Sequence, residues 1–383
     1  MTRSIKIAAI QMIARPAPTS ERLERAEALI AQAASGGAQL VVLPELFNTG
    51  YEYGDQNYLR AEPPDGPTVT WMKQLAARHN VHLAGTLLLL DEEDIYNAML
   101  LVAPEGRIWR YDKNYPWVWE RAYFRDGHDI AIADTSLGKL GMMICWDTAH
   151  AALWARYADK VDAMVICSCP PAMHDLTLVF PDGQRLKSEG AGPIMQQMKR
   201  TSTEMFGDYL RRQSVHLRVP VVNTTGTGKF SSPVPLPHLS LGIYAMMRPD
   251  LWGQLAQAQA ARVETGYFNE TYVADATGRV LQRVPPEVEG YALAEVTLAD
   301  SPPQPQGKQP SFGLSVWPYL ADEFANVMLA PVYRKGIRRA HGRRMAPVSR
   351  QTRIWLGALA VVGVLGFLLG RAARRKRKYQ EAR

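Results

Sequence analysis

The feature that most constrains the fold is an alternation of short apolar runs with helical patterns over the first 224 residues. Strands are predicted at 5–13, 39–43, 81–90, 96–102, 108–112, 140–145, 163–168 and 219–224. Helices are predicted between them, at 21–36, which ends in a glycine pair suited to a C-cap, and at 71–80. Strands that alternate with helices predict an α/β domain whose helices cover a sheet.

The composition is that of a folded globular protein, with 47% hydrophobic and 21% charged residues. The net charge of +7 is unevenly distributed, because residues 301–383 hold 16 Lys or Arg against three acidic residues. A basic C-terminal part of this kind indicates an anionic partner. The sequence has neither aromatic residues interleaved with the basic ones nor a nucleic-acid fold motif, so we expect a lipid surface and no nucleic acid.

An uncharged apolar run at 354–370 predicts a transmembrane helix, because basic residues flank it on both sides. As a helix it would span about 26 Å, near the shortest length that crosses a bilayer. A buried core helix is the alternative, and the dense arginines weigh against it. We therefore expect a membrane-anchored protein with a basic tail at 371–383.

Between the body at 1–300 and the predicted span, the sequence changes character twice. Residues 301–312 are rich in Pro, Gln and Gly, which predicts a linker. Apolar residues then recur at helical spacing from Leu320 to Met328, before Pro331, and predict a short amphipathic helix that packs on its own domain or on a partner subunit. Residues 334–353 carry eight Lys or Arg and no acid, as expected of an arm beside anionic headgroups.

The cysteines indicate the compartment. Cys145, Cys167 and Cys169 are too few for a disulfide framework and favour a reducing environment. The N-terminal 20 residues contain only a short apolar stretch interrupted by polar residues, which predicts a strand and not an export signal. We therefore expect the body in the cytoplasm. Cys167 and Cys169 lack CxxC spacing and histidine partners, so both are expected as packing residues.

Three polar residues each stand at the end of an apolar strand. Glu45 follows VVLP, Lys113 follows IWRYD, and Cys145 ends GMMIC. Ligands in open α/β folds bind at the carboxyl ends of the strands, where these side chains can converge. A carboxylate can take the proton of a thiol, and an ammonium group can stabilise both the thiolate and the oxyanion that forms when it attacks a carbonyl or nitrile carbon. The three residue types together predict acyl-transfer chemistry.

In these stretches the chain resembles the nitrilase, or carbon-nitrogen hydrolase, superfamily. The matching stretches are VVLPELFNTGY around Glu45, RIWRYDKNYP around Lys113, WERAYFRDGHD around Glu120 and GMMICWD around Cys145. The resemblance covers about residues 4–300. It implies a nitrilase-like αββα sandwich, formed when two αββ subunits or halves pack, and a homo-oligomer, a dimer or larger.

The resemblance also implies roles for the site residues. Glu45 would take the proton of the Cys145 thiol as the sulfur attacks an amide carbon. Lys113 and the backbone N–H of Trp146 would hold the oxyanion, and water would then hydrolyse the thioester. Glu120 would support Lys113. No cofactor or metal is implied, and the eight histidines show no ligand spacing.

The substrate is less constrained than the chemistry. The sequence CWD favours an amide or N-carbamoyl substrate, because CWE is the commoner form in nitrilases of the family. A nitrilase, an acyltransferase at the membrane and a non-catalytic scaffold subunit are the alternatives. His150 is expected at the rim of the pocket. The apolar segment 226–266 is expected as a lid, a partner or membrane site or, more commonly, a satellite core.

Overall fold

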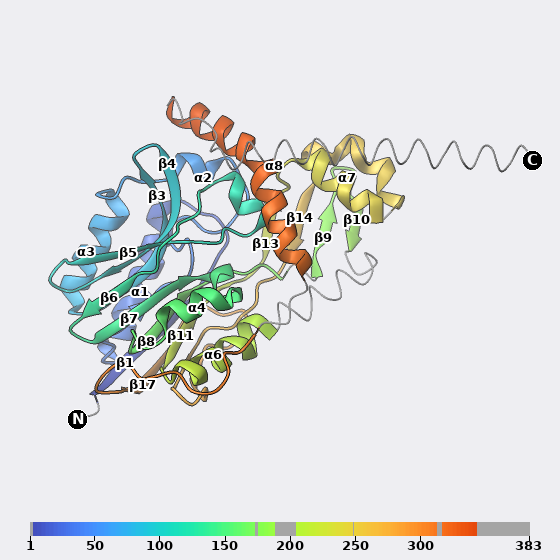
Figure 1. Ribbon diagram of the computed structural model, residues 1–383. Coiled ribbons are helices and arrows are strands. Elements are labelled where there is room, and N and C mark those ends of the chain that lie inside the picture. The colour runs from blue at the N-terminus through green and yellow to red at the C-terminus, as the bar shows by residue number, and fades with distance from the viewer. Residues whose placement is uncertain (1–2, 173–174, 188–203, 248, 312–315, 343–383) are drawn as a thin grey trace, which may run out of the picture.

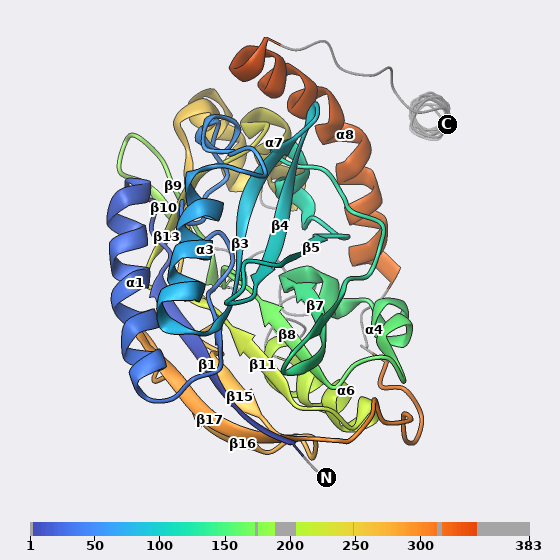
Figure 2. The same ribbon diagram turned by 90° about the vertical axis from the view of Figure 1, so that its left-hand side faces the viewer.

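The computed structural model describes residues 3–172, 175–187, 204–247, 249–311 and 316–342. Two sheets face each other and helices cover the outer face of each, which gives the four layers αββα seen in Figures 1 and 2. The predicted α/β sandwich is confirmed. All four layers come from one chain, so a second subunit, which the resemblance left open, is not needed to complete them.

The first sheet has the strand order β12-β1-β2-β3-β4-β5, and β17 pairs with β1 on the side opposite β2. Its strands are β1 (Arg3–Ile13), β2 (Leu40–Val42), β3 (His82–Asp91), β4 (Asp94–Val102), β5 (Ile108–Asp112), β12 (Gly226–Thr227) and β17 (Gly290–Leu298). Strands β1, β2 and β3 are parallel, β4 reverses, and β5 reverses again. The carboxyl ends of β2 and β5 therefore lie at the same edge of this sheet.

The second sheet has the order β16-β15-β11-β8-β7-β6. Its strands are β6 (Ile132–Thr135), β7 (Gly138–Ile144), β8 (Ala163–Cys167), β11 (Val221–Thr224), β15 (Tyr272–Ala274) and β16 (Val280–Arg283). Strands β7, β8 and β11 are parallel, so their carboxyl ends share one edge. Cys145 was predicted to end a strand, but β7 stops at Ile144 and Cys145 begins the turn that follows.

Alternation along the strands explains the layers. In β1, Ile7 and Ala9 face the second sheet, whereas Ala8 and Ile10 pack against the helices α1 (Thr19–Ser35) and α3 (Pro67–His79). The helices α4 (Ala151–Tyr157) and α6 (Leu210–Leu217) cover the second sheet in the same way. Each sheet is thus apolar on both faces, as the nearly continuous apolar strand sequences require.

The segment 226–266 forms a satellite core together with two strands that precede it, β9 (Thr177–Val179) and β10 (Arg185–Lys187). The segment itself contributes β13 (Phe230–Pro233), α7 (Pro237–Met247), the 3-10 helix η6 (Pro249–Ala260) and β14 (Arg262–Thr265). The four strands form a small sheet of order β10-β9-β14-β13. Phe230, Leu241, Leu251 and Val263 are buried in one apolar cluster. The apolar sequence of this segment is therefore used in packing, the commoner of the explanations expected from the sequence.

Helix α8 (Val316–His341) is longer than the sequence predicted. The helix was expected to stop before Pro331, because proline removes a helical hydrogen bond and clashes with the preceding turn. Pro331 is exposed, while Ala330, Tyr333 and Ile337 on either side are buried against the body. Tertiary packing therefore outweighs the local penalty. The first part of the predicted basic arm is also helical and docked.

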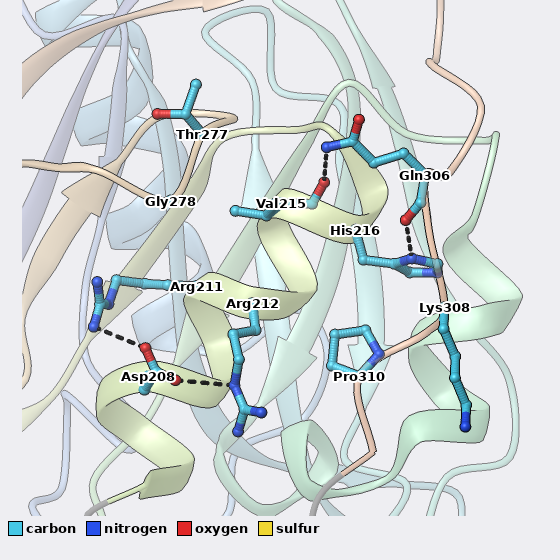
Figure 3. Close-up of a pocket in the computed structure, with 10 residues that line it drawn as sticks. All are labelled: Asp208, Arg211, Arg212, Val215, His216, Thr277, Gly278, Gln306, Lys308 and Pro310. Carbon is cyan, nitrogen blue, oxygen red and sulfur yellow. Dashed lines mark hydrogen bonds and ion pairs between the residues drawn. The ribbon is translucent and has the colours of Figure 1, made fainter.

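The Pro- and Gln-rich segment after β17 is held against α6. The Gln306 N–H donates to the His216 carbonyl oxygen at 2.8 Å, His216 Nδ1 donates to the Gln306 carbonyl oxygen at 2.7 Å, and Gln213 Nε2 donates to the Pro310 carbonyl oxygen at 2.9 Å. Together with α6 this segment borders a cavity of about 490 Å³, which Arg211, Arg212, Lys308 and other residues line (Figure 3).

The predicted transmembrane helix at 354–370 and the tail at 371–383 lie outside the described residues. Within the ranges that the structure does describe, no helix combines the length with the apolar character needed to cross a bilayer.

Candidate active site

Strand ends bring the predicted reactive residues to one region of the sandwich. Glu45 lies just beyond β2, Lys113 directly follows β5, and Cys145 directly follows β7 on the facing sheet. Glu120 lies on the 3-10 helix η1 (Val118–Ala122). Because β2, β5 and β7 end on facing sheets, residues separated by dozens of positions lie near one another, and the charges of Glu45, Lys113 and Glu120 act on Cys145.

Lys113 lies between two carboxylates. Its Nζ donates to Glu45 Oε1 at 2.8 Å and to Glu120 Oε2 at 2.6 Å. The exposed fraction of each of these three side chains is 0–1%. We name Glu45, Lys113 and Glu120 the buried cluster. An ion group so completely removed from water is stable only when every charge is well paired.

Three further groups hold the carboxylates of the buried cluster, and none of them was predicted from the sequence in this role. Asn97 Nδ2 donates to Glu45 Oε1 at 2.8 Å, and the Tyr51 hydroxyl donates to Glu120 Oε1. The Trp117 N–H donates to Glu120 Oε2 at 2.6 Å. The signal for Asn97 was its place as a lone amide in an apolar strand, where an unpaired polar side chain would be costly. Tyr51 gave no such signal.

Cys145 has a backbone conformation that few residues adopt. Its φ is +48°, in the left-handed region, and its carbonyl oxygen accepts a hydrogen bond from Thr148 Oγ1 at 2.7 Å. Leu46, next to Glu45, and Val118, close to Glu120, also have positive φ values, of 50° and 29°. Non-glycine residues in this region are strained, and such strain concentrates at functional sites.

Asp147 fixes the turn that carries Cys145, a role that the sequence did not reveal. Its carboxylate accepts hydrogen bonds from the Tyr111 hydroxyl at 2.7 Å, the Tyr115 N–H at 2.8 Å and the Ile144 N–H at 3.1 Å. Burial raises the pKa of Asp147 to about 7, against the opposing effect of Lys113 and these donors. The turn is thereby tied to the strand end that precedes Lys113.

Burial and charge set the protonation of the site in the absence of substrate. Burial favours a neutral amine at Lys113, but Glu120 and Glu45 outweigh it and raise the pKa of the lysine, so it is charged. Burial and the charge of Glu45 raise the pKa of the Cys145 thiol, while Lys113 and a hydrogen bond from the Cys169 backbone oppose them. The thiol is therefore protonated at neutral pH, and attack by sulfur requires a base.

The remaining predicted residues lie close to this centre. Trp146 is 8% exposed, and its ring lies edge-on to the His150 ring with centroids 6.1 Å apart. The His150 ring stacks on Tyr115 with centroids 3.4 Å apart. Burial, with a smaller effect of Arg121, lowers the pKa of His150 to about 4, so the imidazole is neutral at pH 7.

Cys167 and Cys169 are fully buried and free, as predicted for packing residues. Cys167 packs in the cluster between the two sheets, whereas Cys169 packs in the cluster that contains the satellite core. Burial raises the pKa of both thiols. In the part of the chain that the structure describes, no three His, Cys, Asp or Glu side chains gather as metal ligands would.

Comparison with known proteins shows what this chain is similar to. The family model "Carbon-nitrogen hydrolase" matches residues 6–305. The chain is 33% identical over 185 residues to a nitrilase from Pyrococcus abyssi, a match that covers 47% of this chain and 68% of the relative. Other curated nitrilases match over 42% to 62% of their own length.

Two solved structures give the same fold. A CN-hydrolase superfamily protein from Xanthomonas campestris, with an arsenic adduct in its active site, has a TM-score of 0.55 at 17% identity, over 78% of this chain and 91% of that one. An amidase from Nesterenkonia sp. AN1, in which acrylamide has added to the active site cysteine, has a TM-score of 0.54 at 15% identity, over 76% and 92%. At such low identity the likeness shows the nitrilase-like fold alone.

Proposed function

The chain belongs to the carbon-nitrogen hydrolase family, and we propose that it hydrolyses a non-peptide C–N bond through a thioester on Cys145. One observation carries the proposal. Cys145, whose backbone is strained, experiences the charge of the buried Lys113 and of the two carboxylates that pair with this lysine. Apolar residues of similar size in these positions would give the fold equal or greater stability. The charged arrangement has a chemical use, which is the activation of the thiol.

Glu45 is the proposed base. Its Oε1 accepts hydrogen bonds from Lys113 and Asn97, whereas no partner of Oε2 is found among the described residues. Burial raises the pKa of this carboxyl group above its ordinary value, which brings its proton affinity closer to that of a thiol. Glu45 Oε2 would thus accept the Cys145 proton as the sulfur attacks.

The rest of the reaction conserves atoms and charge. The sulfur forms a bond to the carbonyl carbon, and the oxyanion faces the Lys113 ammonium and the Trp146 N–H. The C–N bond breaks when Glu45 returns the proton to the leaving amine. Glu45 then takes a proton from water, whose oxygen attacks the thioester carbon. The C–S bond breaks, Glu45 gives the proton to the sulfur, and the acid leaves as the thiol is restored.

The proposed substrate is a small amide or N-carbamoyl compound, which the CWD sequence at Cys145 favours. A nitrile is the second candidate, because the curated relative from Pyrococcus abyssi is a nitrilase. The same thiol would then attack the nitrile carbon, and a nitrogen anion would form where the oxyanion does in an amide. An acyltransferase would use the same thioester but pass the acyl group to an amine.

A substrate screen tests the proposal. Short amides, N-carbamoyl amines and nitriles are incubated with the full chain and with Cys145→Ala, and release of acid and of ammonia or amine is measured. The proposed function predicts acid release from at least one amide or N-carbamoyl compound and loss of that activity in Cys145→Ala. The matched control is Cys167→Ala, another buried thiol, which should keep the activity.

Other results lead elsewhere. Activity on nitriles alone supports the second candidate, and acyl transfer to an added amine without free acid supports an acyltransferase. Equal labelling of Cys145, Cys167 and Cys169 by an electrophile, with no turnover of any compound, contradicts catalysis and supports a scaffold subunit.

Membrane attachment and oligomerisation stay predictions from the sequence and from the resemblance. We propose that the apolar run 354–370 holds the protein at a membrane with the body in the cytoplasm, and that the body forms a homo-oligomer. Carbonate extraction of membranes from cells that express the full chain, compared with a chain ending at Gly342, tests the first. Release of the full chain by carbonate would contradict it. Light scattering on the shorter chain tests the second, and a monomeric mass would contradict it.

A further inference from the structure

Helix α8 lies beyond residues 6–305, the part of the chain that the family model matches. It runs along one side of the body (Figures 1 and 2). It contacts the short helix α2 (Gln56–Leu59) and η1, the element that carries Glu120. A helix outside the family domain thus touches the segment that supplies one carboxylate of the buried cluster. Its contacts show how firmly it is held.

Tyr333 anchors the middle of α8. The side chain is fully buried, and its hydroxyl donates to Asp94 Oδ1 at 2.9 Å. The Tyr333 hydroxyl oxygen also accepts a hydrogen bond from the Ile95 N–H at 2.8 Å. The Arg125 guanidinium lies 5.0 Å from the centroid of the Tyr333 ring, within the range of a cation–π contact. Arg125 follows η1 closely, and its N–H donates to the Ile95 carbonyl oxygen at 2.7 Å.

Gly336, one turn further on, lies directly against Tyr58. A Cβ atom added at Gly336 would come closer than 3.0 Å to three atoms of the Tyr58 side chain, so no larger residue fits there unless α8 or Tyr58 moves. A glycine within a helix is otherwise unfavourable, which marks this position as a site of close approach. The His341 ring nitrogen also lies 2.7 Å from the Tyr58 carbonyl oxygen.

Tyr58 continues the chain of contacts to the candidate active site. It is almost fully buried, and its hydroxyl donates to the carbonyl oxygen of Ala122, two residues after Glu120 on η1. Its ring also packs against Tyr123, with centroids 5.5 Å apart. Gly336 on α8, the Tyr58 ring, the Tyr58 hydroxyl and η1 therefore form one continuous series of contacts.

We propose that α8 and Tyr58 form a support that holds η1 in place, and that Tyr58 is a positioning residue for Glu120. The C-terminal helix would then set the distance between Glu120 and Lys113, and with it the charge that acts on Cys145. This inference rests on the proposed function only for its effect on turnover. Its effect on the thiol can be measured without any substrate.

The test uses Tyr58→Phe, which keeps the ring against Gly336 and removes only the hydrogen bond to Ala122. The measurement is the rate of iodoacetamide alkylation at Cys145 from pH 6 to pH 10, read by mass spectrometry of the full chain. Because the charge of Glu120 adds to burial and to the charge of Glu45 in raising the pKa of Cys145, a loosened Glu120 should shift the alkylation profile to lower pH. We expect alkylation at a given pH within this range to become roughly 3-fold faster or more.

Turnover should move in the opposite direction. If the proposed function is right, Tyr58→Phe should lower kcat by about 5-fold or more and leave KM within about 2-fold, since η1 acts on the transition state through Lys113. Gly336→Ala, which pushes α8 away, should act in the same sense. The matched control is Lys335→Ala, the exposed neighbouring residue on α8, which should change neither rate.

The outcomes are distinguishable. Unchanged alkylation profiles in Tyr58→Phe and Gly336→Ala overturn the inference, even if turnover falls, because Glu120 would then not have moved. A changed alkylation profile at Cys145 in the two variants, together with a wild-type protein that turns over no substrate, supports the inference and contradicts the proposed function. Labelling of Cys167 and Cys169 to the same extent as Cys145 signifies general loosening and also overturns the inference.

Discussion

Two ion clusters in this molecule have the same plan with opposite charges. In the buried cluster the Lys113 ammonium lies between the carboxylates of Glu45 and Glu120, at 2.8 Å and 2.6 Å. In the surface cluster, which we define as Asp208, Arg211 and Arg212, one carboxylate lies between two guanidinium groups, at 3.1 Å and 2.9 Å (Figure 3). The exposed fractions differ, at 0–1% in the buried cluster and 34–55% in the surface cluster.

The difference shows that the environment decides what an ion pair is worth. Water screens the surface cluster and solvates each member when the pairs break, so its contribution to stability is small. The buried cluster loses that solvation, and removal of Lys113 leaves two carboxylates without a cation. Of the two clusters, the buried one changes the pKa of a thiol, that of Cys145. The same chemical pairs therefore contribute weakly to folding at the surface, and in the interior they form the site to which we assign the chemistry.

The largest effect is expected from Glu45→Gln. This change keeps the side-chain shape but removes the proposed base, and loss of a general base lowers kcat by about 10²–10⁴-fold. Burial makes the charged form of Glu45 unfavourable, so the free energy of unfolding should stay the same or rise. Steady-state kinetics and urea unfolding measure the two quantities. The matched change in the surface cluster, Asp208→Asn, should leave kcat unaltered.

Equal activity of wild type and Glu45→Gln would contradict the proposed base. A fall in stability as large as the fall in activity would instead indicate that the buried cluster serves mainly the fold.

The next effect is on stability. Lys113→Met leaves Glu45 and Glu120 facing each other without a cation, and breaking a buried ion group in this way costs about 3–5 kcal/mol. The loss should be greatest at neutral pH and shrink in acid, because protonation of either carboxyl group relieves the repulsion. Urea unfolding at pH 5 and pH 7.5 measures it. Arg212→Met, the control at the surface, should cost less than about 1 kcal/mol. A comparable loss in both variants would contradict the distinction between the clusters.

Much of the fold could be predicted from the sequence, because periodicity is a local property. The strand at 96–102 and the helix at 71–80 agree with β4 and α3 to within a few residues. The end of α8 could not be predicted in this way. Pro331 is a local stop signal, and only the burial of Tyr333 and Ile337 against distant residues overrides it. The sequence around residue 331 does not indicate that the body offers a surface on which the helix can pack.

The proximity of Glu45 and Lys113 could be predicted, because each follows a strand whose carboxyl end lies at the same edge of one sheet. Their partners Tyr51 and Asn97 were missed, because hydrogen bonds between residues far apart in sequence depend on the tertiary fold. The roles assigned to Glu45, Lys113, Glu120, Cys145 and Trp146 stay predictions until activity is measured. The strained φ of Cys145 could also not be predicted, because the apolar strand pattern continues without a break up to this residue.

Asp147 is a buried carboxyl group that should make the free energy of unfolding depend on pH. Its pKa is about 7 in the folded protein, above the ordinary value of 3.8, so the folded chain keeps a proton that the unfolded chain releases. Its contribution to stability is therefore present at pH 4 and is lost as pH rises to about 7, by as much as about 4 kcal/mol. Asp147→Asn should remove this dependence. Urea unfolding between pH 4.5 and pH 7.5 measures the two slopes, and parallel slopes would contradict the assignment.

The smallest effect is expected where water reaches the charges. Asp208→Asn removes the carboxylate that Arg211 and Arg212 share, and exposed pairs of this kind contribute about 0.2–1 kcal/mol. The difference from wild type should shrink further when sodium chloride is raised from 0.05 M to 0.5 M, since the screening length falls to about 4 Å at the higher salt. Thermal unfolding at the two salt concentrations measures it. A loss of several kcal/mol that persists in high salt would mean that this cluster, like the one around Lys113, depends on exclusion of water, and the contrast between the two would no longer hold.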